Sequence, residues 1–144
     1  MHIRAIFVLA ACTALAGCAK PEPVNITETG TLAEGDLVLE DDSSLYDEYT
    51  FTAAAGMRIV VEMTSDQFDA YVHLAGPNDL HEQNDDFDAA VGTNAKIEYT
   101  AVSNGTYRVL ANAFGAPSCE GEGEEEVCEN VGDYTVTIVT TAAE

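Results

Sequence analysis

Short runs of alternating apolar and polar residues fill most of this chain from residue 30 onward, and this period of two limits its fold more than any other feature. Successive side chains of a β-strand point to opposite faces, so these runs indicate strands with one buried face. The clearest runs are residues 49–53, 57–63, 95–101, 107–111 and 134–138, and weaker ones are residues 31–39 and 69–74. No segment has the apolar spacing of an amphipathic helix. The pattern predicts an all-β protein, an antiparallel β-sandwich of jelly-roll type with seven to eight strands.

Turn-forming residues separate the predicted strands. Gly76-Pro77-Asn78-Asp79 and Asn104-Gly105 have compositions typical of β-turns. Ala55-Gly56 is short enough to close a hairpin, so we expect the strands on either side of it to be neighbours in one sheet. Tyr107 and Tyr134 each open a strand two residues after a glycine, which fits either a tyrosine corner or an ordinary strand tyrosine.

The amino terminus has the organisation of an export signal. Arg4 is followed by an almost entirely apolar run over residues 5–16, which is shorter than the ~20 residues of a transmembrane helix. Leu15-Ala16-Gly17-Cys18 then resembles the lipobox of bacterial lipoproteins, in which the cysteine is acylated and becomes the first mature residue. We therefore expect a signal peptide at residues 1–17, a lipidated tether at 18–29 and the β-sandwich domain at 30–144. The predicted location is the outer membrane, on its periplasmic or surface face.

The cysteines agree with an exported protein. Cys12 lies in the predicted signal peptide and Cys18 is the predicted site of lipidation, which leaves Cys119 and Cys128. An even pair in an oxidising compartment predicts a disulfide. Its 10-residue loop would contribute roughly 2.5–3 kcal/mol through the entropy of the unfolded chain.

Acidic residues greatly outnumber basic ones. The chain has 26 Asp and Glu residues against 5 Lys and Arg, a formal net charge of -21. This balance argues against nucleic acid as a partner, and against electrostatic docking on anionic lipid, because both need clustered basic residues. The hydrophobic content of 47% is high enough for a packed core, which distinguishes the chain from a disordered acidic tail.

Several motifs spread over the predicted domain, from about residue 30 to 140, resemble the bacterial pre-peptidase C-terminal domain. They are residues 46–57, residues 68–72 with the later Asn84-Asp85-Asp86, residues 104–109 and residues 132–136, in the order of that family. The resemblance implies an eight-stranded β-sandwich that is not itself catalytic and is usually appended to exported enzymes. Some relatives bind calcium, and others bind collagen or insoluble polysaccharide. Here the domain fills the mature chain, and the family's acidic segment before the first strand is missing.

Carboxylate and amide side chains gather in a way that calcium could use. Calcium takes six to eight oxygen ligands at flexible geometry. The predicted ligands are Asp47, Asp69, Asn84, Asp85 and Asp86. The alternative is a solvated acidic loop on an acidic protein. The same two interpretations, a cation-recruiting tip or a hydrated loop, apply to the glutamate-rich residues 120–126.

Catalytic motifs are missing from the sequence. It has no His-Glu-x-x-His metal motif and no Gly-x-Ser-x-Gly nucleophile motif. Its many paired carboxylates fit a glycosidase by residue type, but a lone sandwich of this size is expected to offer little cleft to raise one pKa against another. We predict a non-catalytic, lipid-anchored envelope module that binds a protein or a polysaccharide, with calcium as a candidate cofactor. The alternative is an accessory factor that helps another exported protein to assemble or fold, and an enzyme with an unfamiliar site is the third hypothesis.

Overall fold

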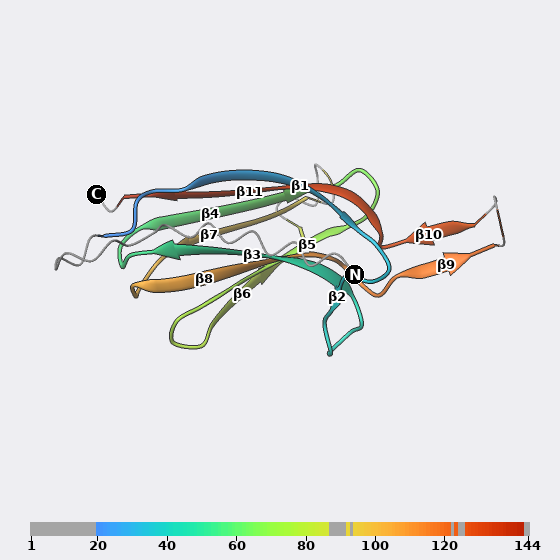
Figure 1. The fold of residues 1–144 in the computed structure, drawn as a ribbon, viewed down its shortest axis with the longest axis horizontal. Helices are drawn as coiled ribbons and strands as arrows, with labels where there is room; N and C mark the ends of the chain where they lie inside the picture. The colour runs from blue at the N-terminus through green and yellow to red at the C-terminus, as the bar shows by residue number, and fades with distance from the viewer. Residues whose placement is uncertain (1–19, 87–91, 93, 122, 124–125, 143–144) are drawn as a thin grey trace.

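Two antiparallel β-sheets face each other in the computed structural model of the chain, which describes residues 20–86, 92, 94–121, 123 and 126–142 (Figure 1). The first sheet has the order β1-β11-β4-β7 and the second has the order β2-β3-β8-β5-β6. The strands of the first are β1 (Asn25–Leu32), β11 (Gly132–Thr141), β4 (Arg58–Thr64) and β7 (Ala95–Thr100). Those of the second are β2 (Leu37–Val38), β3 (Leu45–Ala53), β8 (Gly105–Ala113), β5 (Ala70–Gly76) and β6 (Leu80–Asn84). The predicted signal peptide and Cys18 lie outside the described residues.

The eight longer strands of the sandwich have the order of a jelly roll. Counted along the chain, they form one sheet of strands 1-8-3-6 and another of strands 2-7-4-5. Most connections therefore pass from one sheet to the other, as Figure 1 shows. The predicted fold class, an antiparallel jelly-roll-like sandwich, is confirmed. No helix in the described part of the chain is long and apolar enough to cross a membrane.

Alternating residues of the facing strands form the core. On β4 the buried positions are Ile59, Val61 and Met63, while Arg58 and Glu62 between them are exposed. The same alternation buries Tyr134, Val136 and Ile138 on β11. Since each buried position is an apolar residue of the sequence pattern, burial of one face explains why these segments are strands.

The connection at Ala55-Gly56 differs from its prediction, because β3 and β4 belong to different sheets. The backbone N–H of Gly56 donates to the carbonyl of Ala101, and that of Ala55 donates to the Asn104 side chain. This turn thus packs on the connection between β7 and β8 and links the two sheets. Alternation could not reveal this, because strands of two facing sheets and strands of one hairpin both bury their apolar residues in the same core.

The domain begins earlier than predicted. β1 starts at Asn25, and its residues pair with β11 from Asn25 opposite Val139 to Leu32 opposite Gly132. Residues 25–29 are therefore part of the sandwich and not of the tether. The predicted strand at residues 31–39 is divided between the end of β1 and the two-residue β2. The exposed face of β1 carries polar side chains, so its composition resembles that of a polar tether and not of a strand.

The two tyrosines that follow glycines differ in their roles. The hydroxyl of Tyr107 donates to the carbonyl of Ser103, four residues upstream, at 2.8 Å, as in a tyrosine corner. The hydroxyl of Tyr134 contacts residues of the opposite sheet instead. Tyr107 therefore makes the contact of a tyrosine corner, and Tyr134 does not.

A separate hairpin, which we call the finger, extends from one end of the sandwich (Figure 1). It consists of β9 (Ser118–Glu120) and β10 (Val127–Glu129), which pair only with each other. Cys119 and Cys128 are register partners in it and form a disulfide, with a Cα–Cα distance of 4.0 Å. The predicted disulfide is confirmed.

Candidate functional site: an acidic cleft

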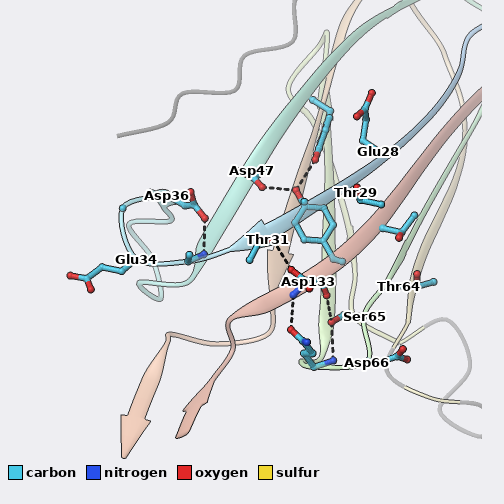
Figure 2. A pocket seen from close by; sticks show the side chains of 17 residues that line it. Glu28, Thr29, Thr31, Glu34, Asp36, Asp47, Thr64, Ser65, Asp66 and Asp133 are labelled. Atoms are coloured by element: carbon cyan, nitrogen blue, oxygen red, sulfur yellow. Dashed lines mark hydrogen bonds between the residues drawn. The ribbon is translucent and has the colours of Figure 1, made fainter. Parts of the chain in front are cut away.

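A cleft of about 930 Å³ opens where the edge strand β1 of one sheet lies near β3 of the other (Figure 2). Its walls come from β1, the following turn, the end of β4, the start of β11 and the middle of β3. The lining residues that carry a charge are Glu28, Glu34, Asp36, Asp47, Asp66 and Asp133. The rest are threonines, serine, glutamine, tyrosines, glycines and alanine.

The cleft has six carboxylates and no basic residue among its lining residues. Arg58, Lys96 and Arg108 lie elsewhere, where they form ion pairs with glutamates on the surfaces of the sheets. Carboxylates that share a recess reinforce one another's field, because the low-dielectric walls keep water from screening them fully. The cleft is therefore a region of strong negative potential.

Tyr134 forms the floor of the cleft, and a glycine makes room for it. Gly30 stands directly opposite Tyr134 in the β1–β11 register. A Cβ atom at Gly30 would collide with the ring and the hydroxyl of Tyr134. The ring is 3% exposed and meets Phe68 edge-on, with ring centroids 6.5 Å apart. A larger residue at position 30 would therefore displace the tyrosine from the cleft.

The Tyr134 hydroxyl joins the two sheets. It donates to Oδ2 of Asp47 at 2.5 Å, and the Tyr49 hydroxyl lies 2.6 Å from it (Figure 2). Burial raises the pKa of Tyr134 far above its usual 10, and the contacts with Asp47 and Tyr49 raise it further. Tyr134 is thus a neutral donor over the whole physiological range, and it holds the Asp47 carboxylate at the floor of the cleft.

Hydrogen bonds fix the remaining walls. Thr31 Oγ1 donates to Oδ1 of Asp133 at 2.5 Å, and the Asp133 N–H donates to Oε1 of Gln67 at 2.7 Å. In the turn after β1, Oδ2 of Asp36 accepts from the N–H of Ala33 at 2.7 Å. These contacts order the recess before any ligand arrives, which lowers the entropy cost of binding.

The polar side chains of the cleft are carboxylates, hydroxyls and amides. The lining residues include no histidine, cysteine or lysine that could act as a nucleophile or transfer a proton near neutral pH. They offer mainly acceptor oxygens, from carboxylates and hydroxyls. Such a surface favours ligands that bring positive charge and several N–H donors.

The predicted calcium ligands do not form one group. Asp47 lies in the cleft, whereas Asp69, Asn84, Asp85 and Asp86 lie next to β5 and β6, two or three strands away in the sheet. Among these four, Asn84 Oδ1 already accepts from the N–H of Lys96 at 3.0 Å. Calcium binding stays a prediction for this group of four.

Asp69 is the most unusual member of that group. Its Oδ1 atom is buried and has no hydrogen-bond partner in the described part of the chain. Burial raises the pKa of Asp69, and the charges of Asp86 and Asp85 raise it further. The charges of Asp85 and Asp86 therefore disfavour ionisation of Asp69, and a cation next to them would relieve that repulsion.

Within the described ranges, three metal-ligating side chains come within 4.8 Å of one another only at Cys119, Glu126 and Cys128. Both sulfurs there belong to the disulfide, so they are not free as metal ligands. The finger carries exposed glutamates at positions 120, 126 and 129. Whether these recruit cations stays a prediction.

The cleft itself was not predicted. Its acids come from residues 28–36, Asp47, Asp66 and Asp133, and none forms a motif in the sequence. Asp47 is the only one of these acids that the sequence predicts as a calcium ligand, and its predicted partners lie elsewhere. The only hint in the sequence is a glycine, Gly30, and a tyrosine, Tyr134, that could face each other. Only the strand register shows that they do.

Comparisons with known proteins identify similar folds but no family. No family model matches the chain, and a search of curated proteins finds no match. Among solved structures, the chain is similar to PliG of Aeromonas hydrophila, described as a periplasmic lysozyme inhibitor of g-type lysozyme. The identity is 12%, the match covers 90% of this chain and 93% of that one, and the TM-score is 0.50.

Two further structures are similar at a TM-score of 0.48. One is the pre-peptidase C-terminal domain of a collagenase from Bacillus anthracis, with 17% identity over 80% of this chain and 89% of that one. The other is PliG of Salmonella Typhimurium, with 13% identity over 88% of this chain and 95% of that one. At these identities the likeness is one of fold, an all-β sandwich.

Proposed function

We propose that this chain is a non-catalytic binding module of the cell envelope whose acidic cleft receives a basic segment of a protein partner. The observation that carries the proposal is the cleft itself, with six carboxylates, no base and a volume of about 930 Å³. That volume is in the range of small-molecule sites, so it accommodates a few side chains of a partner. Arginine fits best, because its planar guanidinium binds carboxylates in a bidentate way.

The charge of the whole chain supports the same conclusion. A net charge of -21 steers positively charged proteins toward the molecule from a distance and accelerates their association. The fold is shared with PliG, which is described as an inhibitor of g-type lysozyme. A g-type lysozyme is accordingly the first partner to test.

The position of the cleft fits a membrane-anchored protein. β1 starts at Asn25, at the end of the sandwich near the last residues of β11, and the cleft lies toward the other end of β1. Cys18 precedes Asn25 by seven residues, a reach of about 25 Å at most. If Cys18 carries lipid, the cleft and the finger face away from the membrane. Cys18→Ser should then release the protein from the membrane fraction, and a variant that stays there would contradict the anchor.

The binding test compares two triple variants of equal charge. Glu28→Gln/Glu34→Gln/Asp66→Asn removes three cleft carboxylates for which no hydrogen bond is described, so folding should be unaffected. The control, Glu40→Gln/Asp79→Asn/Glu82→Gln, removes three exposed carboxylates outside the cleft. The probes are a g-type lysozyme and a decalysine peptide, titrated at two salt concentrations.

The cleft variant should bind at least one probe about tenfold more weakly than the control variant, and the difference should shrink at high salt. Equal losses in both variants would show that only net charge matters. Absence of binding to either probe by the unaltered chain would refute a basic partner.

A further inference from the structure

Two histidines meet on the outer face of the five-stranded sheet, far from the cleft in strand order. His73 lies on β5 and His81 on β6, where they are diagonal neighbours, since His73 is opposite Gln83 and His81 is opposite Ala75. His73 is 5% exposed although it points away from the core, whereas His81 is exposed. The ring of Tyr71 covers His73, with ring centroids 4.4 Å apart.

The two imidazoles present nitrogen atoms to each other. Nδ1 of His73 lies 3.1 Å from Nε2 of His81, and the ring planes differ by 11°. A proton between these nitrogens makes a hydrogen bond, but the same separation also suits a metal ion. Two nitrogens bound at 2.0–2.1 Å to one ion are about 2.8–3.4 Å apart in square-planar or tetrahedral geometry.

The surroundings of His73 favour the metal-binding form of its ring. Burial lowers the pKa of His73, and the neighbouring His81 lowers it further, which favours the neutral ring. Neutral imidazole is the form that binds metal. The carboxylate of Asp42 acts in the opposite direction on the pKa of His73.

Two buried atoms without partners give a second, independent indication. Nε2 of His73 and Oδ1 of Asn112 are both buried and unpartnered in the described part of the chain. Asn112 is fully buried on β8, next to β5, and stands opposite Tyr71 on the same face as His73. A metal on Nδ1 of His73 would place the ring proton on Nε2, and ligating histidines usually donate that proton to a nearby acceptor. Asn112 Oδ1 is a buried acceptor on the same face of the sheet, and it makes no hydrogen bond with Nε2 of His73 in this structure.

We propose that His73 and His81 form a two-histidine site for a divalent transition-metal ion, through Nδ1 of His73 and Nε2 of His81. Water completes the coordination on the exposed side of His81. Imidazole ligands select Zn²⁺, Ni²⁺ and Cu²⁺ over Ca²⁺ and Mg²⁺, and among these ions Cu²⁺ binds most tightly. The site is independent of the basic-partner function of the cleft.

The test uses the full chain with His2→Gln, so that no histidine near the amino terminus binds the ion. Cu²⁺ and Zn²⁺ are titrated by calorimetry, and the Cu²⁺ form is examined by electron paramagnetic resonance. The site variant is His81→Gln, because His81 is exposed and its replacement leaves the core intact. The control is Glu82→Gln, an exposed residue next to it on β6. Thermal melts of the metal-free proteins verify that both variants fold.

One Cu²⁺ ion should bind with nitrogen hyperfine couplings from two imidazoles. His81→Gln should weaken binding at least tenfold and remove one nitrogen from the spectrum, whereas Glu82→Gln should change neither. A spectrum with oxygen ligands only, or equal affinity in His81→Gln, would assign the ion to surface carboxylates and refute the site. A Zn²⁺ affinity that is the same in His81→Gln as in Glu82→Gln would refute it as well.

Discussion

Replacing Tyr134 with phenylalanine tests whether the floor of the cleft also holds the two sheets together. The substitution removes the hydroxyl that donates to Asp47 and contacts Tyr49 while keeping the buried ring. A hydrogen bond to a charged group contributes about 1.5–3 kcal/mol and a neutral one about 0.5–1.5 kcal/mol. Because Asp47 and Tyr49 retain other interactions, we expect a net loss of about 2–3 kcal/mol. For a domain of this size the melting temperature should fall by about 10 °C.

The pH dependence of that loss identifies its cause. The pKa of Tyr134 is raised in the folded state, while an unfolded tyrosine titrates near its usual 10. The stabilisation is therefore complete below pH ~10 and is lost as the pH rises further, because only the unfolded chain then gives up the proton. The difference between the unaltered protein and Tyr134→Phe should shrink by about 1.4 kcal/mol per pH unit above that point.

Urea unfolding followed by circular dichroism at pH 8, 10 and 11 provides the measurement. Tyr99→Phe is the matched control, since Tyr99 is half-buried and no hydrogen bond of its hydroxyl is described. It should change stability by no more than about 0.5 kcal/mol at each pH. If Tyr134→Phe behaves like Tyr99→Phe, or its effect is the same at all three pH values, the reasoning about the Tyr134 hydroxyl is wrong.

The disulfide, the buried histidine and the acids after β6 allow three more tests. Cys119→Ser/Cys128→Ser should lower stability by less than the ~2.7 kcal/mol of the chain-entropy estimate, because the finger pairs only with itself. Hydrogen exchange should become faster in the finger alone, and faster exchange throughout the sandwich would contradict this. Because the pKa of His73 is lowered in the folded protein, its contribution to stability is present above pH ~6.5 and is lost as the pH falls. From pH 8 to 5 the melting temperature of the unaltered protein should therefore fall more steeply than that of His73→Gln, and parallel curves would count against this. Ca²⁺ should raise the melting temperature more than an equal concentration of Mg²⁺, and Asp85→Asn/Asp86→Asn should remove the excess, whereas equal shifts would indicate charge screening alone.

Strands, core and disulfide could be predicted because each depends on local information. Ile59, Val61 and Met63 are buried as their alternation predicts, since a strand with one buried face needs that pattern whatever its partners are. Cys119 and Cys128 are an even pair with no competing cysteine in the predicted mature domain, so their pairing needed no structure. The start of β1 was missed because its exposed threonines and glutamate resemble a polar tether.

The arrangement of the sheets and both candidate sites required the tertiary structure. Alternation shows that a strand buries one face but does not show which sheet it joins, so the segments around Ala55-Gly56 looked like a hairpin although they cross between the sheets. Glu28, Asp47 and Asp133 share a cleft, and His73 meets His81, only because strand order and register bring them together. The sequence by itself therefore determined the fold class and which face of each strand is buried, because alternation along a single strand is enough to show both. The structure decided where charges and ring nitrogens meet, because those contacts depend on pairings between segments that the chain separates.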